Sequence, residues 1–256
     1  MLTYGEMRRI AMRQSAADLN AREEDFVSAE HVITAAGLAP GAKRYYEEPI
    51  SCNFVSYGGN IVAATQPEYR EIVTAYIHKF TWYHCFEMPN LHWLSDRLEP
   101  LGQRVCFMAE YFLPDPERLK PLPCGLETRV LTPADFAELY KPEWSNALCE
   151  KRRQLDMLGV GAYENGVLVG LAGCSADAEE MWQIGVDVLP ACRRRGIAAA
   201  LTSELALEIL KRDKVPFYCC AWSNVNSAGN AVKSGFRPAW VEMSVKPRSV
   251  VDDMNK

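Results

Sequence analysis

The sequence predicts an α/β (α+β) protein in which a mixed, mostly antiparallel sheet is flanked by helices. Some segments repeat apolar residues at helical spacing, and others are short strand-like runs. The turns Gly58-Gly59 and Asn165-Gly166 each separate two strand-like runs, which is typical of β-hairpins. An arginine-rich turn at 193–195 joins a strand-like run to an apolar-periodic helix. These observations indicate a sheet with helices on its faces.

The composition indicates a globular protein. A chain of 256 residues favours either two domains or one large domain, and 48% hydrophobic with 24% charged residues is close to the globular average. The net charge of -5 supplies no basic field for nucleic acid, so we expect no nucleic-acid partner. No apolar run reaches roughly 18 residues, and the start lacks the apolar core of a signal peptide. We therefore expect a cytoplasmic protein without a membrane partner.

The nine cysteines are expected to be reduced core residues. They are odd in number, lie mostly in apolar runs and form no Cys-x-x-Cys pair. His84, Cys85 and His92 lie near one another in the sequence, but no second ligand pair has the spacing of a zinc site. We predict no metal.

The front of the chain is predicted to be a mixed α/β domain. Helical spacing indicates helices at 5–20, 23–36, 68–80 and 90–101. Strands are predicted at 52–56, 60–64 and 104–113. A cluster of four prolines between 114 and 123 prevents a continuing helix or central strand. The boundary is placed there, which gives domains 1–120 and 121–256.

The second domain is predicted to alternate strands with helices. The expected strands are 127–131, the hairpin strands 160–163 and 167–174, then 181–188, 216–221 and a final strand pair near 236–245. The expected helices are 133–139, a segment near 144–155, then 196–212 and 227–234. This is the mixed sheet of the predicted fold class.

The turn after strand 181–188 carries the strongest chemical signal. It reads Arg193-Arg194-Arg195-Gly196-Ile197-Ala198 and opens the helix 196–212. A helix N-terminus has unpaired N–H groups and a partial positive charge, so it can bind a pyrophosphate. Gly196 lacks a Cβ, which lets phosphate oxygens approach the backbone, and arginines add charge-assisted hydrogen bonds. The alternative is an ordinary helix whose arginines are solvated.

This stretch resembles the signature of the GNAT N-acetyltransferase superfamily: glutamine or arginine, two residues, glycine, one residue, then glycine or alanine. Val188-Leu189-Pro190 precedes it, as commonly found at the end of the family's fourth strand. Asn224 is followed eleven and twelve residues later by Gly235-Phe236, which matches a second family motif. The resemblance covers roughly 126–246. It implies the GNAT fold, acetyl-CoA as cosubstrate, and acetyl transfer to an amine by direct attack.

The resemblance also implies a set of residues that bind CoA. The pyrophosphate would be held by the backbone amides of Arg194, Arg195, Gly196, Ile197, Ala198 and Ala199. Arg193 marks the start of this loop, and the main chain of Val188 would pair with the pantetheine arm. Asn224 would reach the same arm where the two central strands splay apart. An alternative for Asn224 is a turn-forming or helix-capping role.

The proton donor differs from the family pattern. Many members carry a tyrosine seven residues after the motif asparagine, but this chain has Ala231. Tyr218, Cys220 or water would then protonate the leaving thiolate. Tyr218 has the alternative role of a packed strand aromatic.

Two carboxylates are candidates for the general base. Asp187 and Glu180 lie on or beside strand 181–188, and the attacking amine must lose a proton. Alternation places Asp187 on the same face as Gln183 and Gly185, so it is the better candidate if that face borders the cleft. A solvated or capping carboxylate is the alternative.

The acceptor is expected to be a small-molecule or peptide amine. Trp144 and Asn146 lie where the family's first two helices meet, a region that usually touches the acceptor. Trp144 could also be a core residue. The ββααβ order of the front half suggests a degenerate second GNAT-like unit, but it contains no arginine-rich loop, so we expect no CoA there. A second hypothesis for the whole protein is a non-catalytic acyl-CoA sensor or interaction protein.

Overall fold

A computed structural model describes residues 2–46 and 50–256. It contains two compact units. Unit 1 consists of Phe112–Pro238 together with the amino-terminal residues up to Ile10, and unit 2 consists of Ala11–Tyr111 and Ala239–Lys256. These units differ from the predicted domains 1–120 and 121–256, because the end of the chain clusters with the front half.

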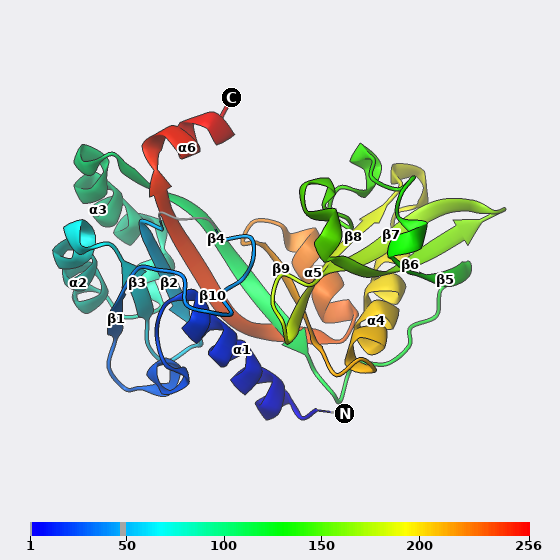
Figure 1. Ribbon diagram of the computed structural model, residues 1–256, viewed down its shortest axis with the longest axis horizontal. Coiled ribbons are helices and arrows are strands. Elements are labelled where there is room, and N and C mark those ends of the chain that lie inside the picture. Colours follow the sequence, from blue (N-terminus) through cyan, green and yellow to red (C-terminus); the bar gives the residue numbers. More distant parts are fainter. Residues whose placement is uncertain (1, 47–49) are drawn as a thin grey trace. The chain divides into compact units, whose positions relative to one another are not determined.

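Unit 1 contains a sheet in which most neighbours run antiparallel (Figure 1). Its strands are β5 (Glu127–Leu131), β6 (Asp156–Glu164), β7 (Val167–Ser175), β8 (Met181–Val188) and β9 (Val215–Ala221). Their spatial order is β9-β8-β7-β6-β5. β4 (Gln103–Pro114) is divided between the units, with only Phe112–Pro114 in unit 1. β8 and β9 are parallel. The predicted mixed, mostly antiparallel sheet is confirmed.

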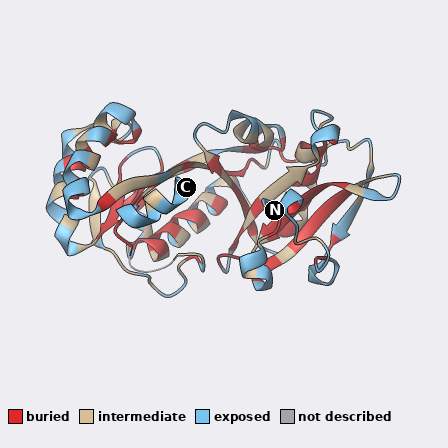
Figure 2. Cartoon of the chain, turned by 90° about the horizontal axis from the view of Figure 1, so that it is seen from above, coloured by how far each residue is buried: buried red, intermediate tan, exposed pale blue. Residues whose placement is uncertain are grey.

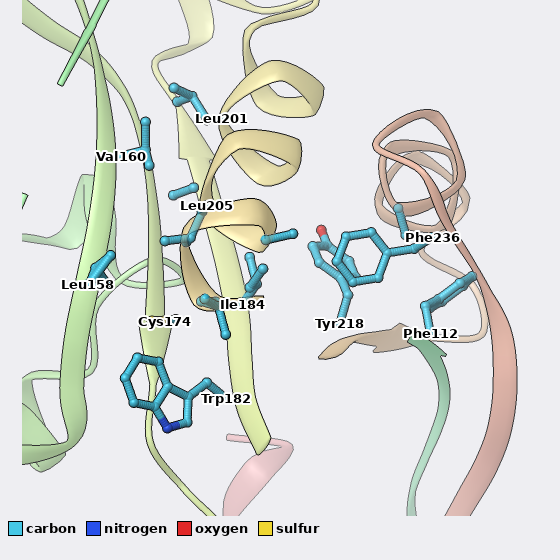
Figure 3. Close-up of a cluster of buried hydrophobic side chains, with 14 of the residues drawn as sticks. Phe112, Leu158, Val160, Cys174, Trp182, Ile184, Leu201, Leu205, Tyr218 and Phe236 are labelled. Carbon is cyan, nitrogen blue, oxygen red and sulfur yellow. The ribbon is translucent and has the colours of Figure 1, made fainter. Parts of the chain in front are cut away.

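Two helices cover one face of this sheet. α4 (Ile197–Leu210) packs on β6, β7 and β8, and α5 (Val225–Lys233) packs on α4 and β9. Leu201 and Leu205 are fully buried against strand residues that include Val160 and Ile184 (Figure 3). Leucines four residues apart lie on one side of a helix, so the apolar spacing in the sequence explains this core.

The opposite face is covered by an irregular segment between β5 and β6. The helices predicted at 133–139 and near 144–155 are wrong. The segment contains only short 3-10 turns, namely Pro133–Asp135, Pro142–Trp144 and Glu150–Leu155. Carboxylates take the backbone amides that a helix would use: Asp135 binds the amide of Thr132, and Asp156 binds the amide of Cys149. Because these amides bond to side chains, the segment does not form the helices that its apolar spacing predicts.

Unit 2 combines a second set of strands with helices. The strands β1 (Val32–Ala35), β2 (Cys52–Ser56), β3 (Val62–Thr65) and β10 (Phe236–Pro247) follow the order β1-β3-β2-β10-β4. The helices are α2 (Arg70–Lys79), α3 (Met88–Leu98), α6 (Arg248–Met254) and the second half of α1 (Tyr4–Asp18), whose residues up to Ile10 belong to unit 1. Further 3-10 turns of the chain are Glu23–Val27, Pro67–Tyr69, His84–Phe86, Glu99–Leu101 and Pro190–Cys192. Apolar residues of α2 and α3 pack with those of β2, β3 and β10.

Two predicted elements of this unit are wrong. Residues 23–36 form a 3-10 turn and β1 rather than a helix, because the β-branched run Val32–Ala35 pairs in parallel with β3. The expected final strand pair is the single strand β10, followed by α6.

Burial follows this architecture. Buried residues concentrate on the strands and on the sheet-facing sides of the helices (Figure 2). All nine cysteines are free. Five of them are buried, but Cys106, Cys124, Cys149 and Cys219 are half-buried, so these four are not the core residues that the sequence predicted. Among the described residues, no helix has both the length and the apolar character needed to cross a bilayer.

A buried ion cluster joins distant segments of unit 2. The Nζ of Lys43 lies 3.0 Å from Asp18 Oδ2 and 3.2 Å from Glu242 Oε1, and the Lys43 side chain is only 1% exposed. Tyr46 and Trp240 also donate hydrogen bonds to Glu242. Burial opposes the charge of Lys43, but the two carboxylates outweigh it and raise the pKa of Lys43 well above its ordinary value.

We predict that Lys43→Ala destabilises unit 2 by about 3–5 kcal/mol, because it leaves two buried carboxylates without their cation. Urea unfolding at neutral pH measures this loss. The matched change at the exposed Lys246 should alter the free energy of unfolding by no more than about 0.5 kcal/mol. A loss below 1 kcal/mol for Lys43→Ala contradicts the prediction.

Candidate active site

A cleft of about 1230 Å³ opens in unit 1 where β8 and β9 separate. The two strands pair in parallel from Met181 and Val215 to Ile184 and Tyr218. β8 then continues to Val188 and β9 to Ala221, and these last residues line the cleft together with the start of α4 and one side of α5. The predicted splay of the two central strands is therefore present.

The predicted pyrophosphate loop forms the floor of the cleft at the start of α4. Arg194 and Gly196 both have positive φ, 64° and 82°. The amide of Ala200 bonds to the carbonyl of Gly196 at 3.1 Å, so the amides just before it have no partner one helical turn earlier. A non-glycine residue at positive φ is strained, and such strain often marks a binding site. Alternating backbone conformations of this kind create concave anion sites.

The space above Gly196 is open. A Cβ at this position would meet only the Nζ of Lys233, at 3.9 Å. A bound phosphate could therefore contact the loop amides from below and a cation on α5 from the other side.

The three arginines of the loop have different positions. Arg193 and Arg194 line the cleft. The Nε of Arg193 donates to the carbonyl oxygen of Val188 at 3.0 Å, which ties the loop to the end of β8. The side chain of Arg195 forms an ion pair with Glu164 at 2.7 Å and is not among the described residues that line the cleft. Only its backbone can serve the predicted role.

Asn224 and Tyr218 meet at Ser227 on the other side of the cleft. Asn224 Oδ1 accepts a hydrogen bond from the amide of Ser227 at 3.1 Å, so Asn224 caps α5 and also lines the cleft. The hydroxyl groups of Tyr218 and Ser227 lie 2.8 Å apart. Burial raises the pKa of Tyr218, although the bond to Ser227 opposes this, so the phenol is protonated at neutral pH.

The two predicted carboxylates occupy different places. Asp187 lines the cleft and accepts three hydrogen bonds, from the amide and side-chain Nδ2 of Asn146 and from the amide of Ala147. Glu180 precedes the other end of β8, about 20 Å away along an extended strand, and is outside the described residues of the cleft wall. The structure brings Asp187 to the site and does not bring Glu180 there.

The two predicted acceptor residues also separate. Asn146 is exposed and lines the cleft. Trp144 is 5% exposed and packs with Leu131, Phe136 and Leu148, so it is a core residue rather than a wall of the cleft. Burial of its large aromatic side chain among these residues stabilises the core.

Several cleft residues were missed by sequence reasoning. Asn226, Asn230 and Lys233 lie on one side of α5 and line the cleft. Their spacing of four and three residues puts them on one helical face, so counting from the motif asparagine could have found them. Gln183 and Cys219 also line the cleft, and Gln183 Nε2 lies 3.4 Å from Cys219 Sγ.

The described residues contain no group of three or more metal-ligating side chains placed to hold a metal ion. Apart from the carboxylate of Asp187, the polar groups that line the cleft are amides, hydroxyl groups, thiols and cations. These groups suit an anionic, phosphate-bearing ligand.

A comparison with protein families identifies this unit. The model of the GNAT acetyltransferase family matches residues 116–239. This segment is a GNAT acetyltransferase domain. The match spans the cleft, the pyrophosphate loop and both sequence motifs, so the resemblance inferred from the motifs is confirmed.

Solved structures of GNAT acetyltransferases are among those similar to this chain. A GCN5-related N-acetyltransferase from Kribbella flavida is 18% identical, with a TM-score of 0.47, over 61% of this chain and 63% of that protein. This chain therefore spans less than two thirds of that protein. A GNAT-family acetyltransferase from Colwellia psychrerythraea is 13% identical, with a TM-score of 0.48, over 96% of this chain and 98% of its own.

A protein from Salmonella typhimurium, solved with its cofactor acetyl-CoA, is 18% identical over 49% of this chain and 95% of its own, with a TM-score of 0.35. A search of curated proteins found no match. The family assignment rests on the family model rather than on these structures.

We predict that saturating acetyl-CoA raises the melting temperature of the GNAT domain by roughly 5–10 °C, since a hundredfold excess over Kd adds about 2.7 kcal/mol. Gly196→Glu should abolish this shift, because a side chain and a negative charge would occupy the phosphate position. Gly166→Glu, at a hairpin turn with similar positive φ, controls for backbone strain and should keep the shift. A full shift in the Gly196 variant contradicts the proposed floor of the cleft.

A pH-dependent prediction concerns Asp156, which holds the amide of Cys149 at 2.9 Å beside the cleft loop. Burial raises the pKa of Asp156 to about 6, while Arg152 and the bond to Cys149 oppose the rise. The unfolded carboxyl ionises near pH 3.9, so the charge destabilises the folded state progressively as pH rises from about 4 to 6.

Asp156→Asn should therefore gain roughly 2–3 kcal/mol relative to wild type between pH 4 and pH 7. Denaturant unfolding at the two pH values measures the difference. The exposed Asp213→Asn should show no such gain. An equal stability difference at both pH values for Asp156→Asn contradicts the interpretation.

Proposed function

We propose that the GNAT domain transfers an acetyl group from acetyl-CoA to an amine by direct attack. The observation that carries this proposal is the position of the pyrophosphate loop at the open end of the β8 and β9 pair. Phosphate-binding amides and unpaired strand edges lie in one cleft, and this combination suits a ligand with a pyrophosphate and a peptide-like arm.

Three parts of acetyl-CoA would be bound by different groups of the cleft. The amides before Ala200, with Arg194 and Lys233, would hold the pyrophosphate. The backbone of β8 from Gly185 to Val188 would pair with the amides of the pantetheine arm, and Asn224 faces the same space. The thioester would then lie near the point where the strands diverge, beside Tyr218.

Direct attack requires only that the amine lose one proton and that the leaving thiolate gain one. The lone pair of the neutral amine attacks the thioester carbonyl carbon, the new C–N bond forms, and the C–S bond breaks as the CoA thiolate leaves. The amine loses one proton and the thiolate gains one. A protonated Tyr218, bonded to Ser227, is the proposed donor to the thiolate, and it regains its proton through that hydroxyl or from solvent.

The proposed test is CoA thiol release over a panel of primary amines. Direct attack requires both substrates to be bound together, so plots of initial velocity at several amine concentrations should intersect. Parallel plots would indicate an acetyl-enzyme and contradict direct attack.

A second candidate is an acyl-CoA sensor that binds without turnover. The observation that favours it is the fully buried Ala231 at the position where many family members have a tyrosine. Stabilisation by acetyl-CoA together with no thiol release from any amine of the panel would support the sensor and reject the transferase.

We predict that Tyr218→Phe lowers kcat by roughly 10- to 100-fold while the melting shift with acetyl-CoA is retained. The effect is at the low end for general acids because a CoA thiolate leaves readily at neutral pH. Tyr163→Phe, a change of the same size in the same unit, should leave kcat unaltered. An unchanged kcat in the Tyr218 variant would assign the proton transfer to water.

A further inference from the structure

The loop that contains Asn146 and Ala147 packs directly on two glycines of the sheet. Gly173 of β7 and Gly185 of β8 are direct partners in the sheet. A Cβ on Gly185 would lie 1.8 Å from the carbonyl oxygen of Asn146, and one on Gly173 would lie 2.1 Å from that of Ala147. Only glycine permits this approach, so the sheet surface is shaped to receive the backbone of this loop.

Asp187 holds the loop on these glycines through hydrogen bonds. It lies two residues after Gly185, on the same face of β8. Its Oδ2 accepts hydrogen bonds from the amides of Asn146 at 2.8 Å and Ala147 at 3.0 Å, and its Oδ1 accepts one from Asn146 Nδ2 at 2.6 Å. Hydrogen bonds to a carboxylate are stronger than those between neutral groups. Both the backbone and the side chain of Asn146 are therefore held in one position.

This arrangement orients the carboxamide of Asn146. Its nitrogen faces Asp187, so its oxygen Oδ1 points away from the carboxylate. Asn146 is exposed and lines the cleft. An amide oxygen in that position can accept a hydrogen bond from an N–H donor. The carboxylate of Asp187 has about four acceptor positions and uses three of them on the loop.

We propose that Asp187 is a positioning residue that acts through Asn146, and that Asn146 Oδ1 accepts a hydrogen bond from the N–H of the acceptor amine. This inference rests on the proposed acetyl transfer. It gives Asp187 a different role from the general base predicted from the sequence, and the proton lost by the amine passes to water in the open cleft. The acceptor class is a primary amine, which offers an N–H to Asn146 while its lone pair attacks.

The test is a double-mutant cycle of Asp187→Ala and Asn146→Ala. The probe is whichever of n-butylamine, lysine and a glycyl peptide the wild type acetylates fastest. Each single variant should lower kcat/KM for the amine by roughly 10- to 100-fold, mainly through KM. The kcat/KM of the double variant should be no lower than that of the less active single variant, because both changes remove the same interaction. Multiplied losses, or an unaffected Asn146→Ala, would overturn the proposal.

The pH profile separates positioning from base catalysis. Asp187→Asn keeps one acceptor oxygen and removes the ionisable group, so its kcat/KM profile should keep the shape of the wild type. Loss of the acidic limb in this variant would show that Asp187 acts as the base and overturn the proposal. Asp135→Asn is the matched control, since Asp135 also binds a backbone amide of this segment but lies outside the cleft wall.

Hydrogen exchange distinguishes failure of this proposal from failure of the proposed function. Protection of the Asn146 and Ala147 amides, measured on the full chain without any amine, should fall at least tenfold in Asp187→Ala while the melting shift with acetyl-CoA persists. Unchanged protection would show that Asp187 does not hold these two amides and would overturn the proposal. If the wild type acetylates none of the probes but the protection is lost as expected, the transferase function fails and the positioning of Asn146 by Asp187 stands.

Discussion

The site depends on one constraint, the separation of β8 and β9 after Ile184 and Tyr218. Backbone N–H and C=O groups need partners, and strands that part inside a sheet leave a row of them exposed. Here that row meets the start of α4, where a helix N-terminus supplies further unpaired amides and partial positive charge. A ligand with a peptide-like arm and a pyrophosphate can satisfy both sets of groups. The cleft is thus a consequence of strand geometry before any side chain is considered.

The two faces of the sheet are covered by different kinds of structure. On one face, α4 and α5 pack a dense apolar core that fixes the pyrophosphate loop and holds Tyr218 beside Ser227. On the other face, the cleft wall is an irregular loop held by Asp187 and Asp156 rather than by helical hydrogen bonds. A loop fixed by a few carboxylates can change its shape without loss of the core. In the proposed function, the cosubstrate and the acceptor would therefore contact different parts of the domain.

The sequence predicts β8 to the residue and α4 to within two residues at each end, because both depend on local periodicity. The motif around Gly196 also places the turn that connects them. The prediction fails where distant residues decide the structure. The helix expected near 144–155 is replaced because Asp187, some forty residues away, captures the amides of Asn146 and Ala147. The ion cluster of Lys43 with Asp18 and Glu242 left no local pattern that sequence reasoning detected.

A crystal structure of the full chain with acetyl-CoA would test the role of the cleft most directly. We expect pyrophosphate oxygens within hydrogen-bond distance of the amides of residues 194–199, the pantetheine arm paired with β8, and the thioester beside Tyr218. A CoA bound outside the cleft between β8 and β9, or a cleft that stays empty at saturating acetyl-CoA, would contradict it.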